Sequence, residues 1–260
     1  FSLFIIPAKI FCILLKYIVL QKVIIIRNAS QFDFGGGERY PIFVSSILKD
    51  NDFDPIIISG SKRLLEYAKT NHIQTIKGWW WKNQNWSSWR VILFPVYIGW
   101  QLILALWYLS VFIKEKPSVV HIHSKDDFIA GTFAAKILGI RVVWTDYADL
   151  KHIWLNLSTW YKNPVGKFVY ISAFLTDAIT VVSKSEQREI TAHLSAGSSV
   201  RKKIIVIYNG CFDVSEAHPK KLSENKITYS IANRLVTDKG LRETIGAFIA
   251  INKKHSNTEL

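Results

Sequence analysis

Residues 22–27 have the sequence KVIIIR, in which four consecutive β-branched apolar side chains stand between two basic ones. Successive side chains of an extended chain point to opposite sides, so this stretch is apolar on both faces. Similar runs recur along the chain, and most are followed by a segment with helical character. These runs are 55–59 (PIIIS), 118–123 (SVVHIH), 141–145 (RVVWT), 178–183 (AITVVS) and 203–208 (KIIVIY). Such strands, separated by helices, predict an α/β fold with a parallel sheet covered on both sides.

Two of the intervening segments have a clear helical period. In the first, Pro41 falls in the predicted first turn, where proline is tolerated. The apolar residues that share its face are Tyr40, Phe43, Val44, Ile47 and Leu48. In the second, Gly139 is placed to end the helix in the left-handed conformation. The shared face of this helix comprises Ala130, Phe133, Ala134, Ile137 and Leu138.

The same pattern divides the sequence into segments. After Asn209-Gly210 the chain becomes polar, which is typical of a linker between domains. The alternation then restarts with a strand at 227–231 and a helix from about 240 to 252, and another strand is expected to begin at 257–260. The predicted segments are 1–21, an apolar N-terminal segment; 22–212, a Rossmann-like domain; 213–226, the linker; and 227–260, the start of a second domain.

Composition narrows the classes of protein. Of the 260 residues 49% are hydrophobic, which supports a sizeable core and argues against disorder. Two cysteines, Cys12 and Cys211, argue against a disulfide framework and favour a reducing compartment. The net charge of +13 favours anionic partners, although no nucleic-acid-binding motif accompanies it. Because the chain contains no Met, we expect the natural N-terminus to lie upstream of Phe1.

Two apolar stretches raise the question of a membrane. Residues 91–113 carry no charge and are long enough to span a bilayer, or they form a helix partly buried in a domain. Residues 1–20 are interrupted by Lys9 and Lys16, which are spaced to share one helical face. We expect both stretches to touch a membrane surface rather than cross it. The cluster Trp79-Trp80-Trp81 is typical either of a membrane interface or of a core.

Candidate site residues follow the predicted strands. The glycines at 35–37 precede a helix, where free N–H groups and the helix dipole favour an anion; a flexible turn is the alternative. Their spacing is not that of a dinucleotide-binding loop. His121 and His123 face the same way at a strand end, so a metal pair with Asp126 or Asp127 is geometrically possible. The alternative is one structural and one exposed histidine.

A second candidate is the pair of cations Arg234 and Lys239, which flank a turn before the predicted helix at 240–252. Two positive charges at a helix N-terminus suit a diphosphate, because charge, hydrogen-bond donors and the helix dipole all favour an anion there. A solvated charged turn has the same spacing, so the two interpretations stay open at this level.

The order of these features resembles the family-four retaining glycosyltransferases. The most specific blocks are PSVVHIHS (117–124), VVSKS (181–185), IYNG (207–210) and RLVTDKG (234–240). The resemblance covers about Lys22 to Leu260. It implies the GT-B fold, with two Rossmann-like doubly wound domains, of which the N-terminal one is complete and the C-terminal one only begins. It also implies transfer of a sugar from a nucleotide-diphosphate sugar with retained configuration, and no essential metal or other cofactor.

The resemblance also implies roles for residues. Gly36 and Gly37 would lie against the donor, and His123 would contact the transferred sugar near the reacting carbon. Arg234 and Lys239 would bind the donor diphosphate and stabilise the negative charge that grows as the bond to the sugar breaks. The residues expected to line the cleft or contact the acceptor are Glu38, Asp146, Tyr147 and Asn209.

The sequence also departs from the family. Tyr147 stands where many members have a histidine, and Asn233 replaces the usual glycine before Arg234. The family's paired glutamates, which hold the nucleotide ribose and contact the sugar, would lie beyond Leu260. We therefore expect the 260-residue chain by itself to be inactive or nearly so.

The expected partners are a nucleotide sugar, a glycan or lipid-linked acceptor, and an anionic membrane surface, without nucleic acid. The expected location is the cytoplasmic face of the cell membrane, in polysaccharide or glycolipid synthesis. Three alternatives remain. The first is a nucleotide-sugar-binding or scaffold protein without catalysis, and the second an integral membrane protein with a span at 91–113. The third is a nucleic-acid-binding module, which rests on charge alone.

Overall fold

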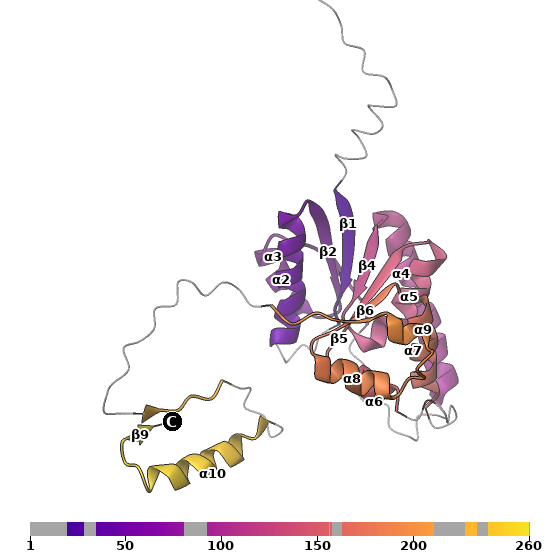
Figure 1. The fold of residues 1–260 in the computed structure, drawn as a ribbon. Helices are drawn as coiled ribbons and strands as arrows, with labels where there is room; N and C mark the ends of the chain where they lie inside the picture. Colours follow the sequence, from indigo (N-terminus) through magenta and orange to yellow (C-terminus); the bar gives the residue numbers. More distant parts are fainter. Residues whose placement is uncertain are drawn as a thin grey trace, which may run out of the picture. The chain divides into compact units, whose positions relative to one another are not determined.

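The KVIIIR stretch forms β1, in the interior of a parallel sheet (Figure 1). The computed structural model describes residues 20–28, 35–80, 93–155, 157, 163–210, 227–232 and 239–259. The chain divides into two compact units, Phe1–Gly210 and Cys211–Leu260. The predicted segment 1–21 and the linker 213–226 lie almost entirely or entirely outside the described residues.

The first unit contains a sheet in the order β3-β2-β1-β4-β5-β6-β7, in which every neighbouring pair is parallel. Its strands are β1 (Gln21–Ile26), β2 (Phe53–Ser59), β3 (Gln74–Lys77), β4 (Val119–Ile122), β5 (Arg141–Asp146), β6 (Ala178–Val181) and β7 (Ile204–Val206). The predicted parallel α/β sheet is thus confirmed. The strand order changes direction between β1 and β4, which is where doubly wound sheets bind ligands at the strands' carboxyl ends.

Helices cover both sides of this sheet (Figure 1). The α2 side carries α2 (Gly36–Asp50) and α3 (Lys62–Thr70). The α4 side carries α4 (Phe94–Glu115), α5 (Phe128–Ile137) and α7 (Pro164–Leu175). The short helices after the strands are η2 (Lys125–Asp127), α6 (Leu150–Ile153), α8 (Lys184–Ala192) and α9 (Ser199–Lys202).

Alternation along β1 feeds the cores on the two sides. Val23 and Ile25 pack with α2 and α3, whereas Ile24 and Ile26 pack with the helices of the α4 side. All four side chains are buried. A strand that is apolar on both faces therefore supplies two cores at once, which is why the KVIIIR pattern requires helices on both sides.

The buried faces of two helices differ from the predicted ones. The first turn of α2 begins at Gly36, so Pro41 lies in the second turn, and it is buried beside Ile42. Ile47, predicted to face the core, is 45% exposed. In α5, Ile137 is 70% exposed although the predicted face included it. Period alone could not choose between faces in these helices, because apolar residues lie all around them. The predicted left-handed Gly139 is confirmed at φ 68°.

The apolar stretch predicted at 91–113 forms α4 over its described part, from Phe94 onward. This helix joins β3 to β4 of the same sheet and buries one face, which includes Tyr97, Leu104, Tyr108 and Phe112. Among the described residues it is the one helix long and apolar enough to cross a membrane, and 28% of its most apolar window is buried.

The tryptophan cluster divides between core and surface. Trp80 is buried, and its ring lies 4.8 Å from that of Trp107 and 5.2 Å from that of Tyr108 on α4. Trp79 is 43% exposed, and Trp81 lies outside the described residues. Of this cluster, Trp80 is therefore a core residue.

The second unit continues the alternation. It contains β8 (Ile227–Thr228), α10 (Leu241–Asn252) and β9 (Thr258–Glu259). β8 pairs in parallel with β9, so the strand expected to begin at 257–260 is confirmed, while the predicted strand 227–231 is shorter than expected. A parallel pair joined by a helix is one right-handed crossover unit of an α/β domain.

Candidate active site

The site begins with His123, which directly follows β4 at the point where the strand order changes direction. Its side chain is 1% exposed. Nδ1 lies 2.8 Å from the hydroxyl oxygen of Tyr147, which follows β5. Nε2 is buried and has no hydrogen-bond partner among the described residues. A buried polar atom without a partner is costly unless a ligand or water completes it, so this nitrogen marks the site.

Arg27 holds the site together from the end of β1. Its Nη1 donates to the backbone oxygen of His123 at 2.7 Å, and its Nη2 donates to Glu38 Oε1 at 3.0 Å. The guanidinium also lies 5.3 Å from the centre of the Tyr147 ring, within the range of a cation–π contact. One buried cation therefore links the residues after β1, β4 and β5 to the first turn of α2.

Glu38 caps the N-terminus of α2 and forms an ion pair with Arg27. Its Oε2 accepts the N–H of Gly35 at 2.9 Å, while Oε1 faces Arg27. Burial raises the pKa of Glu38, but the Gly35 N–H and the charge of Arg27 outweigh it and bring this pKa below its usual value. Glu38 is therefore ionised at neutral pH, and the pair with Arg27 is a genuine ion pair.

The two glycines of the first turn of α2, Gly36 and Gly37, differ in their surroundings. A Cβ on Gly37 would lie 2.9 Å from Nη2 of Arg27, so a side chain there would push the guanidinium out of its present position. A Cβ on Gly36 would meet nothing within 4 Å. Gly36 is exposed and leaves its backbone open to a ligand.

His121 lies on the same side of the sheet as His123, as predicted, and the two rings are 4.0 Å apart. Its Nε2 lies 2.7 Å from Thr145 Oγ1, which lies 2.8 Å from Thr180 Oγ1. The Thr180 hydroxyl donates onward to the oxygen of Trp144 at 3.2 Å. His121 thus has a structural role across three strands. No group of three metal-ligating side chains occurs among the described residues.

Both histidines are held neutral. Burial lowers the pKa of His121 to about 4. Burial, His121 and the charge of Arg27 together lower the pKa of His123 well below its usual value. A neutral imidazole is one donor and one acceptor, so His123 is suited to hydrogen bonding with a ligand rather than to donating a proton as an imidazolium.

Tyr40 contributes an aromatic wall from α2. Its ring centre lies 6.0 Å from that of His123 and 6.1 Å from that of Tyr147. The ring is half-buried, and burial raises the pKa of its hydroxyl. Tyr40 therefore presents an aromatic ring beside the ring of His123, and its hydroxyl stays neutral.

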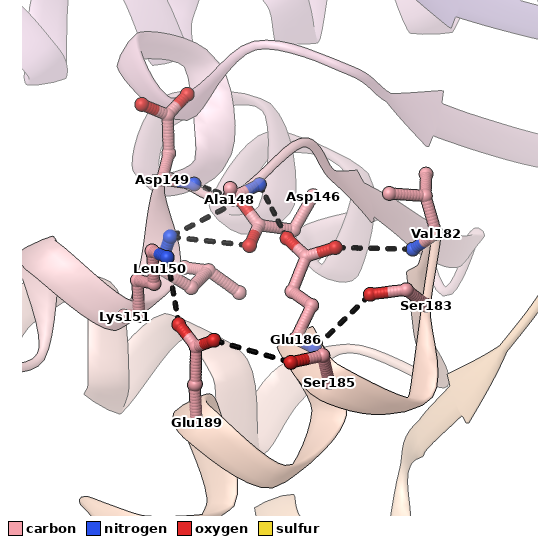
Figure 2. Close-up of polar contacts among 10 residues, drawn as sticks. All are labelled: Asp146, Ala148, Asp149, Leu150, Lys151, Val182, Ser183, Ser185, Glu186 and Glu189. Carbon is pink, nitrogen blue, oxygen red and sulfur yellow. Dashed lines mark hydrogen bonds and ion pairs between the residues drawn. The ribbon is translucent and has the colours of Figure 1, made fainter.

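Asp146 ends β5 and is buried beneath the turn that carries Tyr147 (Figure 2). Its Oδ1 accepts the N–H groups of Asp149 and Leu150, each at 3.1 Å. Glu186, from the first turn of α8, accepts the N–H of Ala148 from the other side. Two buried carboxyl groups thus hold the backbone that positions Tyr147.

The remaining predicted site residues are Asn209, Lys239 and Arg234. Asn209 is exposed, although Gly210 beside it lies against Phe43 of α2. Lys239 belongs to the second unit, before the left-handed Gly240 that precedes α10. Arg234 lies outside the described residues.

Sequence analysis missed Arg27, Tyr40 and Glu186 as members of this site. For Arg27 a signal existed: a cation directly follows an apolar strand, at the end where α/β sheets bind ligands. Tyr40 was assigned to the core face of its helix instead. Glu186 stands three residues after Ser183, the spacing of a helix cap, and this does not foretell its contact with Ala148.

Solved structures share this fold at low sequence identity. A glycosyltransferase from Rickettsia africae ESF-5 aligns over 90% of this chain and 58% of its own, with 17% identity and a TM-score of 0.60. HepE from Anabaena, in complex with UDP and glucose, aligns over 88% of this chain and 58% of its own, with 15% identity and a TM-score of 0.56. MnaA from S. aureus, solved with UDP, aligns over 93% of this chain and 61% of its own, with 13% identity and a TM-score of 0.50. At these identities the likeness is one of fold, the GT-B fold.

The chain thus spans about 58% of the length of the first two of these structures. No curated protein matches the sequence. The model of Glycosyltransferase Family 4 matches residues 34–211, more than half of the chain, and includes Glu38, His123 and Tyr147. The chain therefore belongs to Glycosyltransferase Family 4.

Proposed function

We propose that the intact protein is a retaining glycosyltransferase that moves a sugar from a nucleotide-diphosphate sugar to a glycan or lipid-linked acceptor. The observation that carries the proposal is the buried Nε2 of His123, which lies at the change in strand order and has no partner among the residues that the structure describes. A ligand with oxygen acceptors or donors, such as a sugar, satisfies that nitrogen. Membership of the family supports the reaction class.

The proposed transfer depends on stabilising the negative charge of the leaving phosphate. When the bond between sugar and diphosphate breaks, negative charge grows on the leaving phosphate, and fixed cations stabilise it more in the transition state than in the ground state. Arg234 and Lys239 are the proposed cations. His123 holds the sugar as a neutral hydrogen-bonding group. Because the two cations stabilise the leaving diphosphate, the proposed reaction uses no essential metal or other cofactor.

Structures of similar fold support the choice of donor. HepE was solved with UDP and glucose, and MnaA with UDP. The proposal for this protein is therefore a nucleotide sugar, and the base and sugar are to be found by binding measurements. A role in the synthesis of cell-surface polysaccharide or glycolipid is part of the same proposal.

Calorimetric titration of the complete gene product with UDP, GDP and ADP sugars tests the donor. We expect one class to bind, and His123→Ala, Arg234→Ala and Lys239→Ala each to weaken that binding at least tenfold, because each removes a group that contacts the donor. Lys254→Ala, an exposed lysine of the second unit, is the matched control and should bind as the wild type does. If a folded protein binds none of the three classes, the alternative of a scaffold without catalysis replaces the proposal.

We further propose that the protein works at the cytoplasmic face of the cell membrane, with the outer face of α4 against the lipid. Leu106 is 67% exposed, and the other large apolar side chains exposed on this helix are Val96, Leu102, Ile103 and Ile113. The net charge of +13 adds attraction to anionic lipid. Because the opposite face of α4 is buried against the domain, the helix is proposed to lie on the membrane rather than to span it.

Flotation with vesicles of anionic and of neutral lipid tests this association. We expect binding to anionic vesicles at low salt, lost in Leu102→Ser/Leu106→Ser and reduced by high salt. Cleavage by added protease at one flank of α4, with the other flank protected, would instead favour a spanning helix. The absence of binding to any vesicle would remove the membrane proposal and leave the proposed transfer reaction untouched.

A further inference from the structure

We propose that Tyr147 is a positioning residue that keeps the ring proton of His123 on Nε2, and that Asp146 and Glu186 hold Tyr147 in the place where it does so. The inference rests on the proposed function in one respect only, which is that His123 contacts the ligand. It concerns the turn after β5, where this chain has a tyrosine.

The first step is a count of donors and acceptors. The only described partner of the Tyr147 hydroxyl is Nδ1 of His123, at 2.8 Å, and Nε2 of the same ring has none. If Nδ1 carried the proton, the Tyr147 O–H and the lone pair of Nε2 would both be left unsatisfied. If Nε2 carries it, the O–H donates to Nδ1 and a single donor, Nε2–H, remains. The second arrangement leaves fewer buried groups unsatisfied.

The second step is that both partners are neutral. Burial raises the pKa of Tyr147 well above its usual value, so the phenol keeps its proton. Burial, His121 and Arg27 lower the pKa of His123, so the ring carries only one proton. A neutral phenol and a neutral imidazole then share two protons between three sites, and the hydrogen bond decides which ring nitrogen is the acceptor.

The third step is that the tyrosine is held in place by backbone contacts. Ala148, the next residue, has φ 73°, in the left-handed region that residues other than glycine seldom adopt. Its N–H donates to Oε1 of Glu186, whose Oε2 accepts the N–H of Val182 at 3.2 Å (Figure 2). Oδ1 of Asp146 accepts the N–H groups of Asp149 and Leu150. Four N–H groups are thus bound by two carboxyl side chains, one from β5 and one from α8.

The fourth step is the charge of these carboxyl groups. Figure 2 shows Asp146 and Glu186 side by side below the turn, and both are buried. Burial, a hydrogen bond with Glu186 and the charge of Glu186 raise the pKa of Asp146 well above its usual value. The raised pKa favours a protonated Asp146 beside Glu186. Asp146→Asn keeps an uncharged side chain of the same shape, whose carbonyl oxygen accepts the N–H groups of Asp149 and Leu150 as Oδ1 does now.

The consequence for the ligand follows. His123 presents an N–H donor to whatever binds beside it, so the matching group is an oxygen acceptor, such as a sugar hydroxyl or a phosphate oxygen. Both groups belong to the nucleotide sugar, so analogues that each lack one sugar hydroxyl distinguish them. Loss of affinity for one deoxy analogue assigns the sugar hydroxyl as the acceptor, and equal affinity for all of them assigns the phosphate oxygen.

Nitrogen NMR of protein with 15N-labelled histidine tests the tautomer without any activity measurement. The signals of His123 are identified by their loss in His123→Gln. We expect a protonated Nε2 and an unprotonated Nδ1 that accepts a hydrogen bond. A protonated Nδ1 in the wild-type protein would overturn the proposal, even if nucleotide sugars bind as expected; failure of binding with the expected tautomer would instead count against the proposed function.

Substitutions then test which residues set the tautomer of His123. We expect Tyr147→Phe to shift the Nδ1 signal and to mix the two tautomers, and to lower kcat about tenfold with a smaller change in KM. Glu186→Gln should move the His123 signals in the same direction, because an amide group cannot accept both the Ala148 and the Val182 N–H. Unchanged ring signals in Tyr147→Phe would overturn the assignment of Tyr147.

Glu189→Gln is the matched control, because Glu189 lies on the same helix as Glu186 but is exposed, and it pairs with Lys151 at 2.6 Å. We expect wild-type signals for His123 in this variant. Asp146→Asn should also keep the wild-type signals, whereas Asp146→Leu should shift them. A shift in Glu189→Gln equal to that in Glu186→Gln would show that the buried contacts are not what holds Tyr147.

Discussion

The two sides of the sheet around β4 and β5 differ although they are built from the same strands. On the α2 side, His121, His123 and Thr145 form a buried polar network with Tyr147. On the α4 side, alternate residues of these strands, such as Ile122 and Trp144, enter an apolar core. Neighbouring residues therefore have separate tasks. Substitutions of buried apolar residues on the α4 side should lower stability with little effect on ligand binding at the site, whereas changes on the α2 side should affect both.

The largest effect is expected for Trp144→Ala on the α4 side. Its ring stacks on Phe128 at 4.1 Å, and Nε1 donates to Thr132 Oγ1 at 2.9 Å. Removing a fully buried aromatic side chain costs about 3–5 kcal/mol of unfolding free energy. Urea unfolding measures it, and a loss below about 1 kcal/mol would contradict the view that this side carries the stability.

The next effect is expected for Arg27→Met on the α2 side. Only 13% of the Arg27 side chain and 12% of the Glu38 side chain are exposed, so the substitution leaves a buried carboxylate without its cation. We expect a loss of about 3 kcal/mol, together with loss of nucleotide-sugar binding. Unfolding and calorimetry on the same samples measure both.

The double variant Arg27→Met/Glu38→Gln sharpens this comparison. Because it removes the stranded charge, we expect it to recover most of the stability but none of the binding. Recovery of both would show that Arg27 serves the fold alone, and the two sides of the sheet would then not differ as described.

A smaller effect, dependent on pH, is expected for Asp127→Asn on the α4 side. Burial and the charge of Asp126 raise the pKa of Asp127 to about 8, while Tyr108 donates a hydrogen bond to it at 2.9 Å. The other polar groups around it are Trp80 and Ser124. The folded protein keeps a proton that the unfolded chain, with a pKa of about 3.9, has lost, so the wild type loses stability as pH rises from about 4 to about 8.

We therefore expect Asp127→Asn to gain about 2 kcal/mol relative to the wild type between pH 6 and pH 8, the upper part of that window. Thermal unfolding of both proteins across this range measures it. If the stability of the two proteins changes equally with pH over this range, Asp127 is ionised in the folded protein.

The smallest effect is expected for Leu106→Ser on the outer face of α4. This side chain is 67% exposed and touches no core, so stability should change by less than about 0.5 kcal/mol. A loss above about 1 kcal/mol would show that another part of the protein covers this face, and would set the α4 side apart from the membrane proposal.

Much of the fold could be predicted from local patterns. The parallel strands, the left-handed Gly139 and the restart of the alternation at Ile227 follow from side chains that are apolar on both faces, from a required positive φ and from period. The inward faces of α2 and α5 could not be predicted. Tyr40 faces His123 rather than the core, and Ile137 faces outward, because neighbouring elements decide which of several apolar faces is covered.

The site divides in the same manner. Sequence order placed His123, Glu38, Asp146 and Tyr147 at strand and helix ends, but it did not reveal that Arg27 joins the first two or that Glu186 braces the turn after β5. These contacts connect residues 11 to 96 positions apart along the chain. Local patterns cannot encode them, because Arg27 meets His123 only once β1 and β4 lie side by side, and Glu186 meets Ala148 only once α8 lies beside the turn after β5.

The sequence by itself determined the alternation of strands and helices, because side-chain period and backbone preference act within a few residues. Only the tertiary structure decided which histidine is structural and which has a ring nitrogen without a partner in the described part of the chain. His121 and His123 have nearly the same sequence surroundings, and their difference arises from Thr145 and Tyr147, two residues of the neighbouring strand end that the sheet brings within 2.8 Å.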